Sequence, residues 1–208
     1  MADHMAAEIH IGGKVPRSVA QALCKVVTDT QASLEWGGAA CDISTPEDLL
    51  SSRSVDGDEP NVLKLYDDEA RWGEFETLEA FLQEHGIPYC RWSDGRYEYD
   101  AEAVAFNPNL GLLHWLTDHE QNGMVRESKL RPIVAKLEAL VKSVKRGGAE
   151  ARQALAGMEE TLAALQAELP PQVPPLETLE IAEGRSCPTT TCRSRKCCPA
   201  SRKRKKCG

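Results

Sequence analysis

The sequence predicts a small α/β domain of the ferredoxin-like type, followed by a heptad-patterned long helix or helical hairpin and a disordered tail. Two β-α-β units in tandem, with a hairpin strand after them, predict one sheet with helices on one face. Apolar residues spaced three and four apart from Leu130 predict the helical region. At 208 residues the chain has room for one ordinary domain with appendages.

The first β-α-β unit begins with an apolar run at 8–13, which ends in two glycines and predicts a strand. Ser18 and Gln21 have the spacing of a capping box, and the apolar residues after them recur at helical intervals, so a helix is expected there. Residues 32–36 alternate apolar and polar and predict the second strand. Thr45, followed by proline, predicts the start of a short helix.

The second unit repeats this order. Its three elements are expected as a strand at 62–66, a helix at 75–82 and a strand at 87–92. The segment 92–97 has the composition of a hairpin turn, which would place Tyr97 and Tyr99 on one face of a fifth strand. We therefore expect the α/β domain to span residues 8–107.

A leucine-rich stretch at 108–125 predicts a connecting helix. In 126–169 the apolar positions, Leu155 and Leu162 among them, follow about five heptads, interrupted once at Gly147 and Gly148. Two glycines inside a helix cost about 2 kcal/mol and are equally suited to a tight turn. Two interpretations stay open: one long helix that self-associates as a coiled coil, which we favour, and an antiparallel helical hairpin.

The last two segments differ sharply in composition. Residues 170–184 include two Pro-Pro pairs and predict a stiff, extended linker. Residues 185–208 have almost no apolar content, so they cannot bury a core and are expected to be a basic, cysteine-rich, disordered tail.

Charge is divided between the body and the tail. Nine of the 25 lysines and arginines follow Gly184, where the chain has no acidic residue; 16 basic against 32 acidic residues give 1–184 a formal charge of −16. The body should repel nucleic acid and anionic membranes, whereas the tail should attract both or fold back on the acidic body.

The cysteines favour a reducing compartment. Cys24, Cys41 and Cys90 are scattered through the body, and three cysteines cannot all pair with one another. We interpret them as small buried apolar residues, and we expect a cytoplasmic protein. The sequence has no eighteen-residue apolar run, so no membrane insertion is expected.

The best candidate catalytic cluster is Asp67, Asp68 and Glu69, which follows a predicted strand and precedes a predicted helix. Carboxylates at that point of an α/β sheet often bind Mg²⁺ or a substrate. The competing interpretation, which we favour, is that these residues cap the helix and stabilise its first turn. No motif specifies a cofactor, and none is expected.

The tail offers two weaker candidate sites. Its basic residues are candidate contacts for nucleic acid, an anionic surface or an acidic protein. They are Arg193, Arg195, Lys196, Arg202, Lys203, Arg204, Lys205 and Lys206. Its cysteines lack the C-x2-C spacing typical of zinc sites and are only weak metal candidates. They are Cys187, Cys192, Cys197, Cys198 and Cys207.

Three functional hypotheses follow. The first is a non-enzymatic interaction protein that self-associates through residues 130–169, because the heptad run accompanies no catalytic motif. The second is a nucleic-acid-associated regulator that binds through its basic tail. The third is a Mg²⁺-dependent enzyme that uses Asp67 and Asp68.

Overall fold

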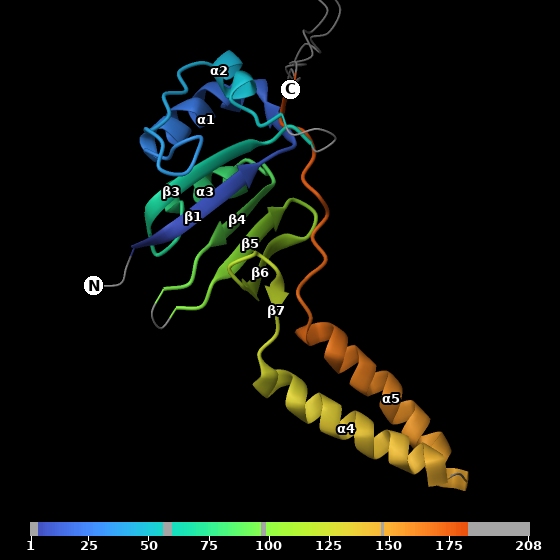
Figure 1. Ribbon diagram of the computed structural model, residues 1–208. Coiled ribbons are helices and arrows are strands. Elements are labelled where there is room, and N and C mark those ends of the chain that lie inside the picture. The colour runs from blue at the N-terminus through green and yellow to red at the C-terminus, as the bar shows by residue number, and fades with distance from the viewer. Residues whose placement is uncertain (1–3, 56–59, 97–98, 147, 183–208) are drawn as a thin grey trace, which may run out of the picture.

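The computed structural model describes residues 4–55, 60–96, 99–146 and 148–182. A mixed α/β body is built on a six-stranded sheet, and two long helices project from it (Figure 1). The strands lie in the order β3-β1-β4-β5-β6-β7, and each neighbouring pair is antiparallel. The predicted mixed α/β class is confirmed.

The middle of the sheet holds the core. Strand β1 (His4–Ile11) lies between β3 (Leu63–Arg71) and β4 (Tyr89–Ser93). Alternate residues of a strand point to opposite faces, and on β1 the set Ala7, Ile9 and Ile11 is completely buried. This face packs against the apolar sides of α1 (Arg17–Asp29) and α3 (Glu76–Glu84) in one cluster.

Helix starts were predicted with mixed success. The capping box at Ser18 is wrong, because α1 begins at Arg17 after Pro16 and has no side-chain cap. A proline before the first turn already has a fixed φ, so the helix can begin without a side-chain cap. The helix start predicted at Thr45 is confirmed by the short α2 (Pro46–Ser51). The structure adds a capping box there: Thr45 Oγ1 accepts from the Asp48 amide, and the Asp48 carboxylate accepts from the Thr45 amide.

The strand expected at 32–36 is wrong as a full strand. Only Ser33 pairs there, in single antiparallel bridges to Tyr66 of β3 and to Ala40. The alternation predicted a ladder, but the chain turns back after Gly37, whose φ is +68°. The Ser33 hydroxyl donates to the Glu35 carbonyl within the same loop, so the segment folds on itself.

The connecting helix expected at 108–125 is also wrong, because the sheet continues there. Strands β5 (Glu102–Asn107) and β6 (Gly111–Thr117) form a hairpin, and β7 (Gly123–Met124) adds a short edge. Gly111, with φ +79°, lies opposite Asn107 where the hairpin closes. The leucines of this stretch fit helical spacing, but pairing with β5 overrides it.

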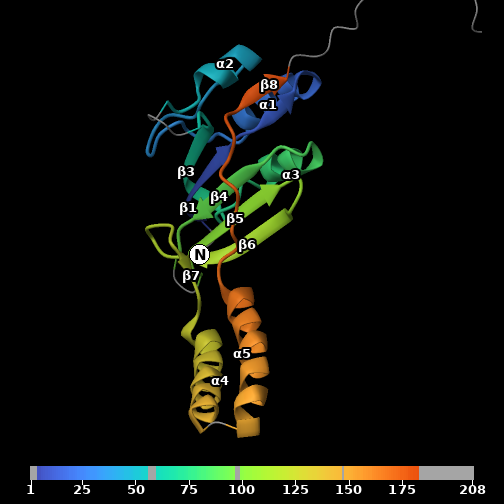
Figure 2. The same cartoon turned by 90° about the vertical axis from the view of Figure 1, so that its right-hand side faces the viewer.

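The region 126–169 forms an antiparallel helical hairpin (Figures 1 and 2). Helix α4 (Glu127–Arg146) and helix α5 (Gly148–Glu168) lie side by side, and Lys136 forms an ion pair with Glu160 across them. The favoured interpretation of one long helix is therefore wrong, and the alternative hairpin is found. No helix in the described part of the chain is both long and apolar enough to cross a membrane.

The predicted linker is extended but belongs to the body. From α5 the chain runs back along the sheet to β8 (Glu180–Ala182), which pairs in parallel with β2 (Lys14–Pro16) (Figure 2). Leu179 is completely buried in the main core. The body therefore extends beyond the predicted range 8–107. The tail, with its basic and cysteine candidates, lies outside the described residues.

Candidate functional site

The predicted carboxylate cluster lies inside a strand. Asp67, Asp68 and Glu69 belong to β3, which continues to Arg71, so neither the helix cap nor the predicted strand end is found. The Asp68 carboxylate accepts from the Gly37 amide at 3.0 Å, and Asp67 accepts from the Glu69 amide at 2.9 Å. Among the described residues, no group of three or more His, Cys, Asp or Glu side chains is arranged to hold a metal ion.

A buried ionic network lies between α3 and the sheet instead. Arg91 of β4 is only 2% exposed, and its Nε lies 2.9 Å from Glu79 Oε1. Glu79 Oε1 also accepts from the Phe75 amide, and its Oε2 accepts from the Tyr89 hydroxyl at 3.0 Å. Burial raises the pKa of Tyr89, so this hydroxyl keeps its proton and remains a donor.

The network continues toward the surface through Glu102. Arg91 donates to Glu102 Oε1 at 2.9 Å, and His114 Nε2 lies 2.6 Å from Glu102 Oε2. Burial acts to raise the pKa of Glu102, but the hydrogen bonds from Arg91 and His114 outweigh it and hold the pKa below its usual value. Glu102 is therefore a paired carboxylate that holds no proton at neutral pH.

Arg91 also fixes a strained turn. Its Nη1 donates to the Gly73 carbonyl at 2.6 Å, and the Glu74 amide closes the turn on the Arg71 carbonyl. Both central residues have positive φ, 59° at Trp72 and 67° at Gly73. Asn, Asp or Gly normally occupies both central positions of such a turn. A left-handed conformation costs an ordinary residue roughly 1–2 kcal/mol. Trp72 takes this conformation although 44% of its surface stays exposed.

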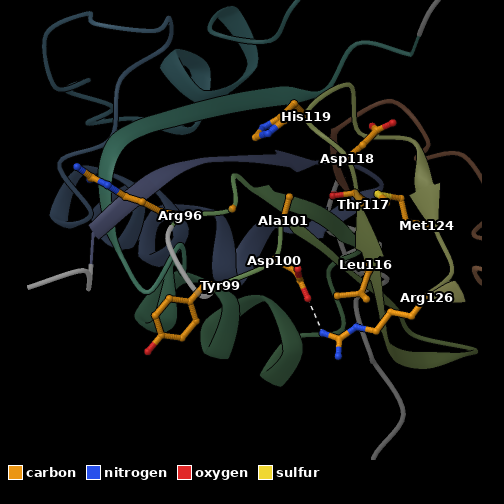
Figure 3. A pocket seen from close by; sticks show the side chains of 11 residues that line it. Arg96, Tyr99, Asp100, Ala101, Leu116, Thr117, Asp118, His119, Met124 and Arg126 are labelled. Atoms are coloured by element: carbon orange, nitrogen blue, oxygen red, sulfur yellow. Dashed lines mark hydrogen bonds and ion pairs between the residues drawn. The ribbon is translucent and has the colours of Figure 1, made fainter. Parts of the chain in front are cut away.

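Two adjoining pockets, of about 460 and 450 Å³, open beside this turn. Tyr99, Asp100, Leu116 and Arg126 line both, and Figure 3 shows Asp100 and Arg126 pointing toward one another in the first. The second pocket adds Trp72 and the two carboxylates Glu74 and Glu102. An indole, a phenol and carboxylates therefore converge on one opening.

The aromatic pair at this opening is exposed. Trp72 and Tyr99 meet edge to face with ring centroids 5.7 Å apart, and each keeps at least 40% of its surface exposed. Glu74 forms no ion pair or side-chain hydrogen bond with a described residue, and burial raises its pKa. We call Trp72, Tyr99 and Glu74 the aromatic corner. It offers two partly exposed aromatic rings and a carboxylate that forms no ion pair with a described residue.

The helical hairpin carries a second exposed surface. Inward positions on α4 and α5 recur at three and four residues, and Gly157 packs against Leu140. Val134 and Val141 each follow an inward residue on α4, as Leu155 and Leu162 do on α5. Because the helices are antiparallel, the residue that follows an inward position points to the same side of the hairpin on both helices. We call these four residues the hairpin stripe; each is 38–55% exposed.

Sequence reasoning missed both surfaces in part. The heptad assignment placed Leu155 and Leu162 in the seam, but the inward positions on α5 are Ala154 and Thr161, which are almost fully buried. The one local signal for the strained turn was a Trp-Gly pair after a strand.

No protein-family model, curated protein or solved structure matches the chain.

Proposed function

We propose that this chain is a non-enzymatic interaction protein that self-associates through its helical hairpin. The observation that carries the proposal is the hairpin stripe. Its apolar residues recur at seven-residue spacing on each helix and lie exposed on the same side of the hairpin. Single exposed apolar residues are common on protein surfaces, but an aligned row on two neighbouring helices is typical of an interface.

The sequence pattern favours a bundle of more than two helices. A two-helix seam needs only two apolar positions in each heptad, whereas bundle helices use a third, flanking position. On α4 and α5 that third position is the stripe. Gly157 against Leu140 and Lys136 paired with Glu160 set a register in which Val141 lies level with Leu155 and Val134 with Leu162.

The opposite side of the hairpin is polar. Lys129 pairs with Glu168 and Lys136 with Glu160 across the two helices there. Among the described residues of the two helices, the stripe side therefore has the large exposed apolar side chains that another hairpin could bury. A second copy of the chain is the proposed partner, because a two-fold axis would place one stripe on the other and form a four-helix bundle.

Solution molar mass tests the proposal. Light scattering on the full-length chain should give at least twice the 22.8 kDa of one chain, and Leu155→Glu with Leu162→Glu should give the monomer mass. The matched control is Ala156→Glu with Ala163→Glu, because these alanines are exposed one position further round α5. A parent mass of 22.8 kDa, or equal masses for both double variants, would reject the proposal.

We also propose that β3, β1 and β4 with α1 and α3 form a ferredoxin-like sandwich whose second strand is shortened. The support is the bridge from Ser33 to Tyr66 on the outer side of β3, where that fold places its second strand. Strands β5, β6 and β7 then extend the sheet beyond β4.

A second candidate function is nucleic-acid binding through the basic tail. The observation that favours it is the nine positive residues after Gly184. Two tails in one dimer would raise the affinity by multivalency. Titration with random DNA and RNA in rising salt is the test, with a full-length variant in which residues 202–206 are glutamine as the control. Equal binding by both chains would reject this candidate.

A further inference from the structure

We propose that the aromatic corner is a binding site for lysine or arginine side chains of a basic peptide segment. The proposal is independent of self-association, because the corner lies on the body and not on the helical hairpin. It rests on backbone strain, on exposed aromatic surface and on an unpaired carboxylate that meet at one pocket.

Strain at Trp72 is the first step of the argument. Asn or Gly would fit its positive φ at lower cost, and the tryptophan placed there keeps 44% of its surface exposed. The Arg91 hydrogen bond to Gly73 then holds the turn in this conformation. Strain that the surrounding structure maintains at an exposed side chain points to a role for that side chain.

The chemistry of the corner selects a cation. Tryptophan and tyrosine rings attract an ammonium or guanidinium group through their π faces, and tryptophan does so most strongly. Glu74 supplies a carboxylate that forms no ion pair with a described residue, whereas Asp100 and Glu102 are already paired. A long side chain can lie along the rings with its charged end at Glu74.

The net negative charge of the whole body also favours a cation at the corner. Residues 1–184 carry 16 basic and 32 acidic residues, so cations are attracted at long range. Two sources can supply the basic segment: the chain's own Arg-Lys-Arg-Lys-Lys run at 202–206, or a separate protein. Both present the same chemistry to the corner.

Calorimetric titration of the full-length protein at low salt, with the blocked peptide Arg-Lys-Arg-Lys-Lys as the probe, tests the site. Trp72→Asn should weaken binding roughly fivefold or more, because it removes the ring and keeps the charge. The same variant should still fold, as circular dichroism can check, since Asn suits the positive φ. Glu74→Gln should weaken binding as well.

The matched control is Trp36→Asn. Trp36 is also 44% exposed, but its ring contacts that of Tyr66 at a tilt, with ring centroids 4.9 Å apart, and it lines neither pocket. Binding by this variant should equal that of the parent chain. If it weakens binding as much as Trp72→Asn, or if no chain binds the peptide, the proposal is overturned.

A full-length variant with glutamine at 202–206 distinguishes the two sources. If the chain's own run occupies the corner, this variant should bind the added peptide more tightly than the parent, because the competitor is gone. If a separate protein is the source, the parent and the variant should bind equally. In both cases Trp72→Asn must still weaken binding for the site to stand.

Discussion

Removing Arg91 should destabilise the body more than any surface substitution. Arg91→Met keeps the length of the side chain but leaves the Glu79 carboxyl buried beside Tyr89 without its cationic partner, and it deprives the Gly73 carbonyl of its donor. Removing one partner of a buried ion pair costs roughly 3–5 kcal/mol. For a chain of this size, that corresponds to a fall of roughly 6–20 °C in melting temperature.

A double-mutant cycle measures the interaction energy between Arg91 and Glu79. Urea unfolding followed by circular dichroism is the assay for the parent, Arg91→Met, Glu79→Met and the double variant. The double variant should recover a large part of the stability lost by Arg91→Met, because no uncompensated charge then remains buried. A loss below about 1 kcal/mol for Arg91→Met alone would refute the reasoning, since it would place Glu79 in contact with water.

Three further predictions concern other parts of the body. In Gly12→Ala the new Cβ would lie 2.4 Å from the Glu177 carbonyl oxygen, so urea unfolding should show a loss of roughly 1–3 kcal/mol; an unchanged midpoint would show that the returning segment is not held there. Burial raises the pKa of the Cys90 thiol to about 11, so its alkylation at pH 8, followed by mass spectrometry, should be far slower than that of free cysteine, and an equal rate would contradict this placement. The pKa of Glu102 is lowered in the folded state, so its stabilisation is present above the ordinary carboxyl pKa of about 4.3 and is lost as the pH falls through the lowered value. The difference in melting temperature between the parent and Glu102→Gln should therefore shrink on acidification below about pH 4, and a constant difference would count against the pairing with Arg91 and His114.

Local patterns were reliable where one residue type has few alternatives. Thr45 before a proline with Asp48 three residues on predicted a helix start that is found, because the capping box is completed within four residues. Leu78 and Leu82 at helical spacing likewise predicted α3, and both are completely buried.

Patterns failed where a distant strand decided the conformation. The stretch 108–125 has helical leucine spacing, but residues 111–117 become β6 because they can pair along the whole of β5. At 32–36 the alternation was real, yet only Ser33 reaches β3. For Asp67 and Asp68, the strand is extended by pairing with β1, so carboxylates expected after its end lie within it.

The sequence by itself determined most of the strands and helices of the two β-α-β units, the heptad spacing of the helical region and the opposite charges of body and tail. These properties depend on residue type and spacing alone. Only the tertiary structure decided that Arg91 is buried between Glu79 and Glu102, that Trp72 takes a strained turn beside Tyr99 and that Leu179 returns to the core. The reason is that each of these contacts joins residues brought together by strand pairing and chain return, and a periodic pattern along one segment carries no information about its partner.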